Sequence, residues 1–346
     1  MNVAILGAGA WGTALAISLS ARHRATLWTN EAAQAEAMSA SRSNQRFLPE
    51  AALPQELQLS ADLDAALAGA ELVLVAVPTS ALRTVLSLVA QRPAPVPVIW
   101  ACKGFEADTA QLPHQVAEET LPQTFPRGVL SGPSFALEVA RGLPTALTLA
   151  SSDGGFARQA AQALHHARLR IYSSTDVAGV EVGGAVKNVL AIAAGISDGL
   201  GFGHNARAAL ITRGLAEMTR MGLKLGGRAE TLGGLSGAGD LILTCTGDLS
   251  RNRKVGMLLA QQQTLSDILQ QLGHVAEGVY TVREVHQLAQ RLGVDMPICE
   301  AVYRVLYEQV PAASAVEALL NRAPSAEFDG EGRRDKREGG REKGEG

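Results

Sequence analysis

Short apolar segments alternate with helical patterns through the first half of the chain. The continuous apolar segment at residues 72–77 is typical of a strand in a parallel sheet that is buried on both faces. Further strands are predicted at residues 3–6, 25–28, 96–101 and 130–132. Helices are predicted between them at residues 11–22, 31–41, 63–68, 80–91 and 112–120. Strands alternating with helices indicate βαβ units, so we predict an α/β, doubly wound domain over residues 1–178.

Helical patterns without strands predominate from about residue 177 onward. Asn205 is predicted to be the N-cap of a helix over residues 206–221, because its side chain can accept a hydrogen bond from the first helical turn. Five more helices are predicted at residues 253–262, 265–271, 279–291, 298–307 and 313–320. We therefore expect an all-α C-terminal domain over residues 179–322, with the domain boundary near residues 176–180.

The end of the chain, residues 323–346, has a different composition. Residues 327–346 include seven acidic residues, six basic residues, six glycines and one phenylalanine. Such a segment cannot bury enough apolar surface to offset the entropy lost on ordering it. We predict a disordered, charged tail.

The composition excludes several classes of function. A net charge of −3 and 4% aromatic residues give no basis for binding nucleic acid or anionic membranes. Cys102, Cys245 and Cys299 lack the paired spacing of a zinc site or a disulfide framework. No segment reaches the ~18 apolar residues of a membrane span, and the apolar N-terminus lacks the basic start of a signal peptide. We expect a soluble, cytoplasmic protein without a metal.

A glycine-rich turn follows the first predicted strand. Gly7, Gly9 and Gly12 have the spacing G-x-G-x-x-G, and a predicted helix begins within this turn. In this context Gly7 makes the tight turn, Gly9 lets the backbone approach a pyrophosphate, and Gly12 allows close packing. The helix N-terminus adds free N–H groups and a favourable dipole. The first domain is therefore predicted to be a Rossmann domain that binds a dinucleotide.

The choice between NAD and NADP stays open in the sequence. NAD-binding domains usually carry an acidic residue at the end of the second strand, where it binds the ribose hydroxyls. Here Trp28 is followed by Thr29 and Asn30, and Glu31 comes one position late. No arginine stands directly at this point to receive a 2′-phosphate. Arg22 or Arg24 could contribute, with a helix end or the surface as the alternative for both.

Lys187 has no polar neighbour on the face of its own predicted helix. The residues beside it are Gly183, Gly184, Leu190 and Ala191, and none of them can pair with an ammonium group. Its side chain either extends to solvent or joins a polar site built by another part of the chain. Because buried lysines change their pKa readily, Lys187 is a candidate for acid–base chemistry.

Four further polar segments lie where a ligand could contact them. Lys103 and residues 132–136 follow predicted strands, at the sheet edge where open α/β sheets bind ligands. Residues 236–240 are expected to form a flexible loop that ends in a carboxylate. Residues 250–254 place cations at a helix start, where they oppose the helix dipole unless an anion binds there. For each segment, an ordinary turn or a solvated surface patch is the alternative.

Taken in order, these motifs resemble bacterial NAD(P)-dependent glycerol-3-phosphate dehydrogenase over residues 1 to about 322. The resemblance rests on residues 7–12, 103–105, 132–136, 181–188, 237–240, 250–253 and 275–278. Two positions depart from the family pattern. Ala10 stands where many members have serine, and Asn30 lies near where many members carry a basic residue.

That resemblance implies an oxidoreductase that reversibly reduces dihydroxyacetone phosphate to sn-glycerol 3-phosphate with NADH or NADPH, for glycerophospholipid synthesis. Lys187 would be the general acid and base, and Arg251, Asn252 and Lys103 would contact the phosphate and carbonyl groups of the substrate. The implied substrate contacts are Lys103, Gly132, Ser134, Lys187, Asp240, Ser250, Arg251 and Asn252. The implied cofactor contacts are Gly7, Gly9, Ala10, Trp11, Gly12, Lys103, Ala136, Arg251, Val275 and Glu277.

Opposing charge effects are expected at Lys187. Lys103 and Arg251 would favour its neutral amine, whereas Asp240 would favour its ammonium form. As ammonium, Lys187 would polarise the substrate carbonyl and deliver a proton, and as amine it would take the proton back. The small residues Gly183 and Gly184 would leave room for substrate beside the amine.

Two alternatives remain. A related β-hydroxyacid or 6-phosphogluconate dehydrogenase also combines a Rossmann domain, a helical domain and a catalytic lysine, but residues 237–240 and 250–253 argue against it. A nucleotide-binding regulator without turnover would not need a lysine beside an anion-binding segment. The apolar helix surface of the second domain predicts a homodimer.

Overall fold

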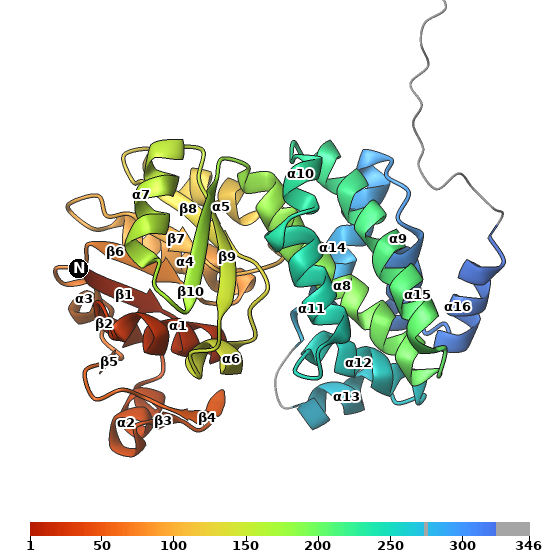
Figure 1. The fold of residues 1–346 in the computed structure, drawn as a ribbon, viewed down its shortest axis with the longest axis horizontal. Helices are drawn as coiled ribbons and strands as arrows, with labels where there is room; N and C mark the ends of the chain where they lie inside the picture. Colours follow the sequence, from red (N-terminus) through yellow and green to blue (C-terminus); the bar gives the residue numbers. More distant parts are fainter. Residues whose placement is uncertain (273–275, 323–346) are drawn as a thin grey trace, which may run out of the picture.

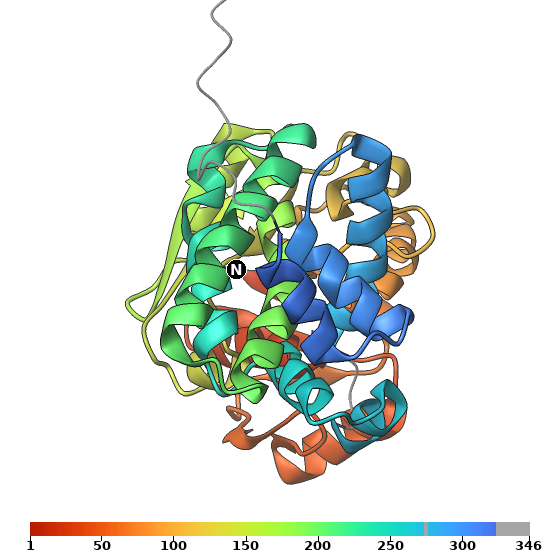
Figure 2. The ribbon, with the colours of Figure 1, turned by 90° about the vertical axis from the view of Figure 1, so that its right-hand side faces the viewer.

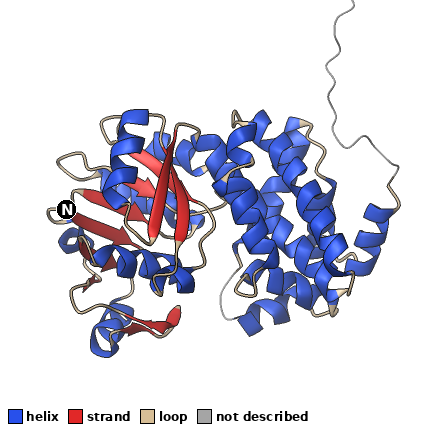
Figure 3. Cartoon of the chain, in the orientation of Figure 1, coloured by secondary structure: helices blue, strands red, loops and turns tan. Residues whose placement is uncertain are grey.

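In the computed structural model, which describes residues 1–272 and 276–322, an α/β half lies beside an all-helical half (Figure 1). All described strands belong to the first half, as the colouring by secondary structure shows (Figure 3). Seen from the helical side, the helices of the second half stand in front of the strands (Figure 2). The predicted fold class is confirmed. The predicted roles of Val275 and of residues 323–346 lie outside the described residues.

The main sheet has eight strands in the order β10-β9-β8-β7-β6-β1-β2-β5. Neighbouring strands are parallel, except that β9 pairs antiparallel with β8. The strands of the main sheet are β1 (Asn2–Leu6), β2 (Arg24–Trp28), β5 (Gln58–Ser60), β6 (Leu72–Val75), β7 (Val98–Trp100), β8 (Arg127–Ser131), β9 (Thr145–Ala150) and β10 (Leu169–Ser174). A separate antiparallel hairpin contains β3 (Ser43–Asn44) and β4 (Leu48–Ala52).

The predicted strands correspond to β1, β2, β6, β7 and β8, and β6 is buried at every position. The other five strands were not predicted. In β10, at the edge of the sheet, Leu169 and Ile171 are buried while Arg170 and Tyr172 are exposed. Such alternation gives no continuous apolar segment, and β3 and β5 are too short to give any strand pattern.

Helices cover both faces of the main sheet, as a doubly wound fold requires. One face packs against α1 (Ala10–Ser20) and α7 (Gly154–Leu164), and the other against α3 (Leu63–Leu67), α4 (Thr79–Ala90) and α5 (Pro113–Thr120). Two further helices of this half are α2 (Ala32–Ser41) and α6 (Ala136–Ala140). The carboxyl ends of β7 and β8 face the helical half, because both strands lead directly into segments that contact α8.

The helical half is built around α8 (Val177–Gly199), whose N-terminus is capped by Asp176 through a hydrogen bond from the Gly179 amide. Every residue from position 179 to position 197 is buried. Around α8 lie α9 (Gly203–Lys224), α10 (Ala229–Leu232), the π-helix η1 (Leu235–Gly239), α11 (Asp240–Thr246), α12 (Arg251–Ala260), α13 (Leu265–Leu272), α14 (Glu277–Leu292), α15 (Pro297–Tyr307) and α16 (Ala312–Leu320).

Two expectations for this half need correction. Asn205 is not an N-cap, because α9 begins at Gly203 and Asn205 lies inside its first turn. Helix α8 is also long and apolar enough to cross a membrane, although no such segment was expected, and 89% of its most apolar window is buried inside the protein. Burial on all sides is characteristic of the central helix of a globular core.

Helices α8 and α12 cross in close contact, because each has a glycine at the crossing. A methyl group on Gly195 would overlap the carbonyl oxygen of Arg253, and one on Gly256 would overlap the carbonyl oxygen of Ile192. The two backbones therefore touch without intervening side chains. This contact fixes the start of α12 beside the middle of α8.

Gly256→Ala is expected to lower the free energy of unfolding by about 1–3 kcal/mol, because the added methyl group must push α12 away from α8. Chemical denaturation measures the change. Gly233→Ala is the matched control, since a methyl group there would make only ordinary contacts, the nearest at 3.5 Å. Equal stability of both variants would contradict the close crossing.

Candidate active site

The glycine turn between β1 and α1 has the geometry of an anion-binding site. Gly7 has a φ of 115°, which favours glycine, and a side chain on Gly12 would overlap the carbonyl oxygen of Gly7. Gly9 faces open space, since a Cβ atom there would meet nothing within 4 Å. No side chain caps α1, and its first turn has no acidic residue. Its first N–H groups are therefore available to a pyrophosphate.

Side chains from two other segments hold this turn in place. The carbonyl oxygen of Ala8 accepts hydrogen bonds from Gln34 Nε2 at 3.0 Å and from Asn44 Nδ2 at 2.9 Å. Asn44 also donates to Thr13 Oγ1 at 2.9 Å. Thus α2 and the β3–β4 hairpin both anchor to the turn. Trp11 follows Ala10 at the start of α1, and its buried Nε1 has no hydrogen-bond partner among the described residues.

Three charged side chains meet where the two halves join. Asp240, at the start of α11, pairs through Oδ1 with Lys187 Nζ and through Oδ2 with Lys103 Nζ, both at 2.6 Å. Lys187 comes from the middle of α8, and Lys103 follows β7. Asp240 is 1% exposed. A carboxylate from a distant segment is thus the polar partner of Lys187, as expected from the sequence.

Backbone and hydroxyl groups complete the contacts of the two ammonium groups. Lys187 Nζ donates to Thr244 Oγ1 at 3.0 Å, and this hydroxyl donates in turn to the carbonyl oxygen of Asp240 at 2.6 Å. Lys103 Nζ donates to the carbonyl oxygen of Gly132 at 3.2 Å. Ser134 Oγ donates to the same oxygen at 2.9 Å. The segment after β8 is therefore bound directly to the charged cluster.

Burial sets the acidity of Lys187. The net pKa of Lys187 is lowered to about 8, because burial and the Lys103 charge lower it and the Asp240 carboxylate opposes both only in part. Burial alone would raise the pKa of Asp240, but the two ammonium groups outweigh it and hold that pKa below its usual value. The expected opposition between Lys103 and Asp240 is present. Desolvation makes the largest contribution to the lowered pKa of Lys187, and it depends on packing that the sequence does not display.

The start of α12 lies beside this cluster. Ser250 is its N-cap and accepts a hydrogen bond from the Arg253 amide at 3.2 Å. Arg253 pairs with Asp198 at 2.7 Å and with Asp248 at 3.0 Å, so carboxylates balance its charge. Arg251, the first residue of α12, is exposed instead. Of the two arginines, Arg251 and not Arg253 is therefore the one that an anionic ligand can reach.

Asn252 links three helices. Its Nδ2 donates to Asn188 Oδ1 on α8 at 3.0 Å, and its Oδ1 accepts from the Gly278 amide at the start of α14 at 3.0 Å. Glu277 is the first residue of α14 and contributes to the electrostatic field at Lys187. Asn252 thus aligns the predicted cofactor contact Glu277 with the helix that carries Lys187.

Sequence reasoning missed three polar side chains at this site. Asn188 Nδ2 and Ser131 Oγ are buried without a hydrogen-bond partner among the described residues, and Thr244 binds Lys187 directly. Thr244 lies four positions after Asp240, so both would have shared one helical face if residues 240–246 had been assigned to a helix. Together with Trp11, the unpartnered groups are polar atoms that a bound dinucleotide and substrate can satisfy.

Two expectations at the site were wrong. Residues 236–240 do not form a flexible loop, because residues 235–239 form η1 and Asp240 begins α11. Gly183 and Gly184 do not leave room for substrate. A Cβ atom on Gly183 would meet the Ser236 carbonyl oxygen, and one on Gly184 would lie 2.9 Å from Ser131 Oγ. Protein atoms fill both spaces, so the two glycines let η1 and β8 approach α8.

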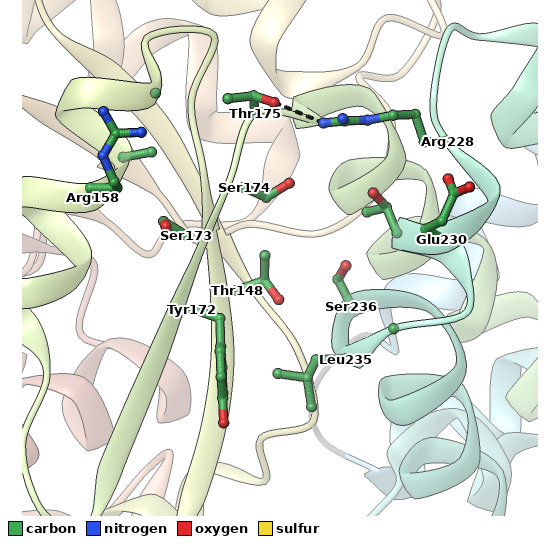
Figure 4. Close-up of a pocket in the computed structure, with 14 residues that line it drawn as sticks. Thr148, Arg158, Tyr172, Ser173, Ser174, Thr175, Arg228, Glu230, Leu235 and Ser236 are labelled. Carbon is green, nitrogen blue, oxygen red and sulfur yellow. Dashed lines mark hydrogen bonds between the residues drawn. The ribbon is translucent and has the colours of Figure 1, made fainter.

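A separate cavity of about 590 Å³ lies between the β9–β10 edge of the sheet and the α10–η1 segment (Figure 4). Its lining includes Arg158, Tyr172 and Ser236, and Arg228 donates to Thr175 Oγ1 across its upper end at 2.8 Å. The three members of the charged cluster are not among its lining residues. This cavity is therefore distinct from the candidate active site.

Models of the two domains of NAD-dependent glycerol-3-phosphate dehydrogenase match the chain, the N-terminal one over residues 2–157 and the C-terminal one over residues 176–317. The chain belongs to the glycerol-3-phosphate dehydrogenase family. It is 60% identical over 332 residues to glycerol-3-phosphate dehydrogenase (NAD(P)+) of Nitrosospira multiformis, covering 95% of this chain and 100% of that protein. The Nitrosomonas europaea enzyme of the same name is 61% identical over 330 residues, with the same coverage.

A solved structure agrees with this assignment. The crystal structure of glycerol-3-phosphate dehydrogenase from Coxiella burnetii superimposes with a TM-score of 0.89 at 44% sequence identity. The match covers 93% of this chain and 99% of the other. Both halves of the fold are therefore those of the family.

Proposed function

We propose that this family member interconverts dihydroxyacetone phosphate and sn-glycerol 3-phosphate, with Lys187 as general acid and base. Its membership makes it an NAD(P)-dependent oxidoreductase, consistent with a role in glycerophospholipid metabolism. The observation that supports the role of Lys187 is its buried pairing with Asp240, which Lys103 shares. A lysine pKa of about 8 leaves both protonation states accessible near neutral pH.

The chemistry divides between the cofactor and the protein. When bound at the glycine turn, the nicotinamide dinucleotide supplies or accepts the hydride. In the reducing direction, the Lys187 ammonium donates a hydrogen bond to the substrate carbonyl oxygen and passes its proton to that oxygen. In the oxidising direction, the Lys187 amine accepts the hydroxyl proton. Thr244 and Asp240 hold the Nζ atom in place through both steps.

The predicted substrate contacts fit the phosphate end of the substrate. Arg251 is exposed at a helix start, and its planar guanidinium can bind two phosphate oxygens at once. Lys103 and Ser134 converge on the Gly132 carbonyl oxygen, on the side of the cluster supplied by β7 and β8. We propose that residues 1–178 bind the cofactor and residues 179–322 contribute most substrate contacts.

A direct assay tests this function. The purified chain is expected to oxidise both NADH and NADPH in the presence of dihydroxyacetone phosphate, followed by loss of absorbance of the reduced cofactor. A β-hydroxyacid and 6-phosphogluconate serve as control substrates, each paired with the matching oxidised cofactor. Faster turnover of either control would contradict the proposal, as would cofactor binding without any turnover.

The oligomeric state can be measured on the same purified protein. We propose a cytoplasmic homodimer, supported by apolar side chains that remain exposed at both ends of α9, namely Phe202 and Leu223, which are 46% and 53% exposed. Sedimentation at micromolar concentration should give twice the mass of the chain. A monomer would contradict this part of the proposal.

A further inference from the structure

The β3–β4 hairpin carries an arginine to the end of β2. Asn44, in β3, is buried and donates to Ala8 in the glycine turn and to Thr13 in α1. Two residues later, Arg46 Nη1 donates to both carboxylate oxygens of Glu31, at 3.0 and 2.9 Å. Because the hairpin is anchored to the glycine turn, Arg46 is held beside the segment that would bind the dinucleotide.

The end of β2 is the position that selects between the two cofactors in Rossmann domains. An acidic residue there binds the ribose hydroxyls of NAD, and an arginine nearby accommodates the 2′-phosphate of NADP. Glu31 is the residue just before α2, three positions after the end of β2. Asn30 supplies no charge. This chain therefore has both an acid and an arginine close after the selecting position, joined as an ion pair.

We propose that the Glu31–Arg46 pair selects the cofactor, with Glu31 accepting a hydrogen bond from the 2′-hydroxyl of NAD and Arg46 binding the 2′-phosphate of NADP. Arg46 thus supplies the positive charge that many family members carry near position 30, where this chain has Asn30. The inference rests on the proposed function, because it requires that a nicotinamide dinucleotide binds at the glycine turn.

Little free energy is lost when Arg46 leaves Glu31 to bind a 2′-phosphate. The side chains of Arg46 and Glu31 are 55% and 52% exposed, and exposed ion pairs contribute little to stability because water screens them. A phosphate monoester carries more charge than a carboxylate and binds arginine through two parallel hydrogen bonds. A 2′-phosphate can therefore take Arg46 from Glu31.

Both side chains have a suitable place after the exchange. Glu31 is the N-cap of α2, and its side chain makes no capping hydrogen bond. A released carboxylate can therefore turn toward the free N–H groups of α2, where the helix dipole favours negative charge. The Arg46 guanidinium lies over the Phe47 ring, 4.8 Å from its centre, which keeps it at the hairpin tip.

Binding measurements on the full chain test this inference. Calorimetric titration with NAD+, NADP+ and adenosine 2′,5′-bisphosphate gives affinities that do not depend on turnover. Arg46→Ala is expected to weaken NADP+ and the bisphosphate by about tenfold or more and NAD+ by less than about threefold, because a lost charge-assisted contact is worth about 1.4 kcal/mol or more. Glu31→Gln is expected to weaken NAD+ by a few-fold and to strengthen NADP+.

The opposite direction of the two effects on NADP+ is the decisive readout, because both substitutions break the same ion pair. Arg141→Ala is the matched control, since it removes another exposed pair, Arg141–Glu50, from the other strand of the same hairpin. Its affinities should equal those of the unmodified chain. If Arg46→Ala and Glu31→Gln change NADP+ affinity alike, the pair only stabilises the hairpin and the inference is overturned. Failure of the unmodified chain to bind any dinucleotide would overturn the proposed function as well.

Discussion

Lys187→Met is expected to lower the rate of dihydroxyacetone phosphate reduction by about 10³-fold, because it removes the proton donor and the positive charge at the carbonyl oxygen. The loss should appear mainly in kcat, since the proton is transferred at the chemical step. Steady-state kinetics with saturating cofactor measures it. Retention of more than a tenth of the turnover would contradict the role assigned to Lys187.

The fold should survive this substitution. Methionine has a length similar to that of lysine, and Asp240 keeps its pair with Lys103 at 2.6 Å, so no buried carboxylate loses its last partner. Lys224→Met, at the exposed end of α9, is the control for a lost lysine charge. Denaturation curves and NAD+ titration should give similar values for both variants and the unmodified chain.

The pH dependence gives a second signature of Lys187. Reduction needs the ammonium form, so its rate should fall as the pH rises through the Lys187 pKa of about 8. Oxidation needs the amine, so its rate should rise over the same interval. In Lys187→Met both of these changes near pH 8 should be absent.

The alternation of apolar strands with helices was sufficient to predict the doubly wound sheet, since strands buried on both faces have continuous apolar sequences. The edge of the sheet could not be predicted this way. Strand β10 alternates buried and exposed residues, and the hairpin that carries Asn44 and Arg46 has a two-residue strand. This hairpin nevertheless anchors the glycine turn through Asn44 and carries the arginine that we assign to cofactor selection.

The lack of any neighbour in its helix that can pair with an ammonium group predicted that Lys187 either extends to solvent or has a polar partner elsewhere in the chain, and the family resemblance indicated Asp240. The helical conformation of the segment that ends in Asp240 could not be predicted. Glycines at positions 237 and 239 favour a loop, and packing overrides this preference. The backbone of Ser236 fits directly against Gly183 of α8, so tertiary contact stabilises η1 and places Asp240.

Asp240→Asn is expected to lower kcat for reduction at pH 7 by about 100-fold, because the carboxylate orients both lysines and raises the Lys187 pKa. Without it, burial and the neighbouring Lys103 charge are opposed only by the weaker attraction of Glu277. The Lys187 pKa should then fall below 8.

The two reaction directions should respond oppositely to this lowered pKa. The pH profile of reduction should begin to fall at lower pH, so less of the active ammonium form remains at pH 7. The rate of oxidation still increases with pH, but the increase should begin at a lower pH. A larger share of the maximal oxidation rate is therefore reached at pH 7. Full pH profiles in both directions therefore separate the effect on the pKa from a general loss of activity.

Asp176→Asn is the matched control for Asp240→Asn. Asp176 is also a buried aspartate, but it caps α8 and accepts a hydrogen bond from the Arg228 amide at 2.8 Å instead of pairing with a lysine. Its pH profiles should keep the midpoint near 8, even if its stability falls. An unchanged or raised midpoint in Asp240→Asn would contradict the conclusion that this carboxylate supports the charged form of Lys187, whereas a lowered midpoint with intact cofactor binding would establish it.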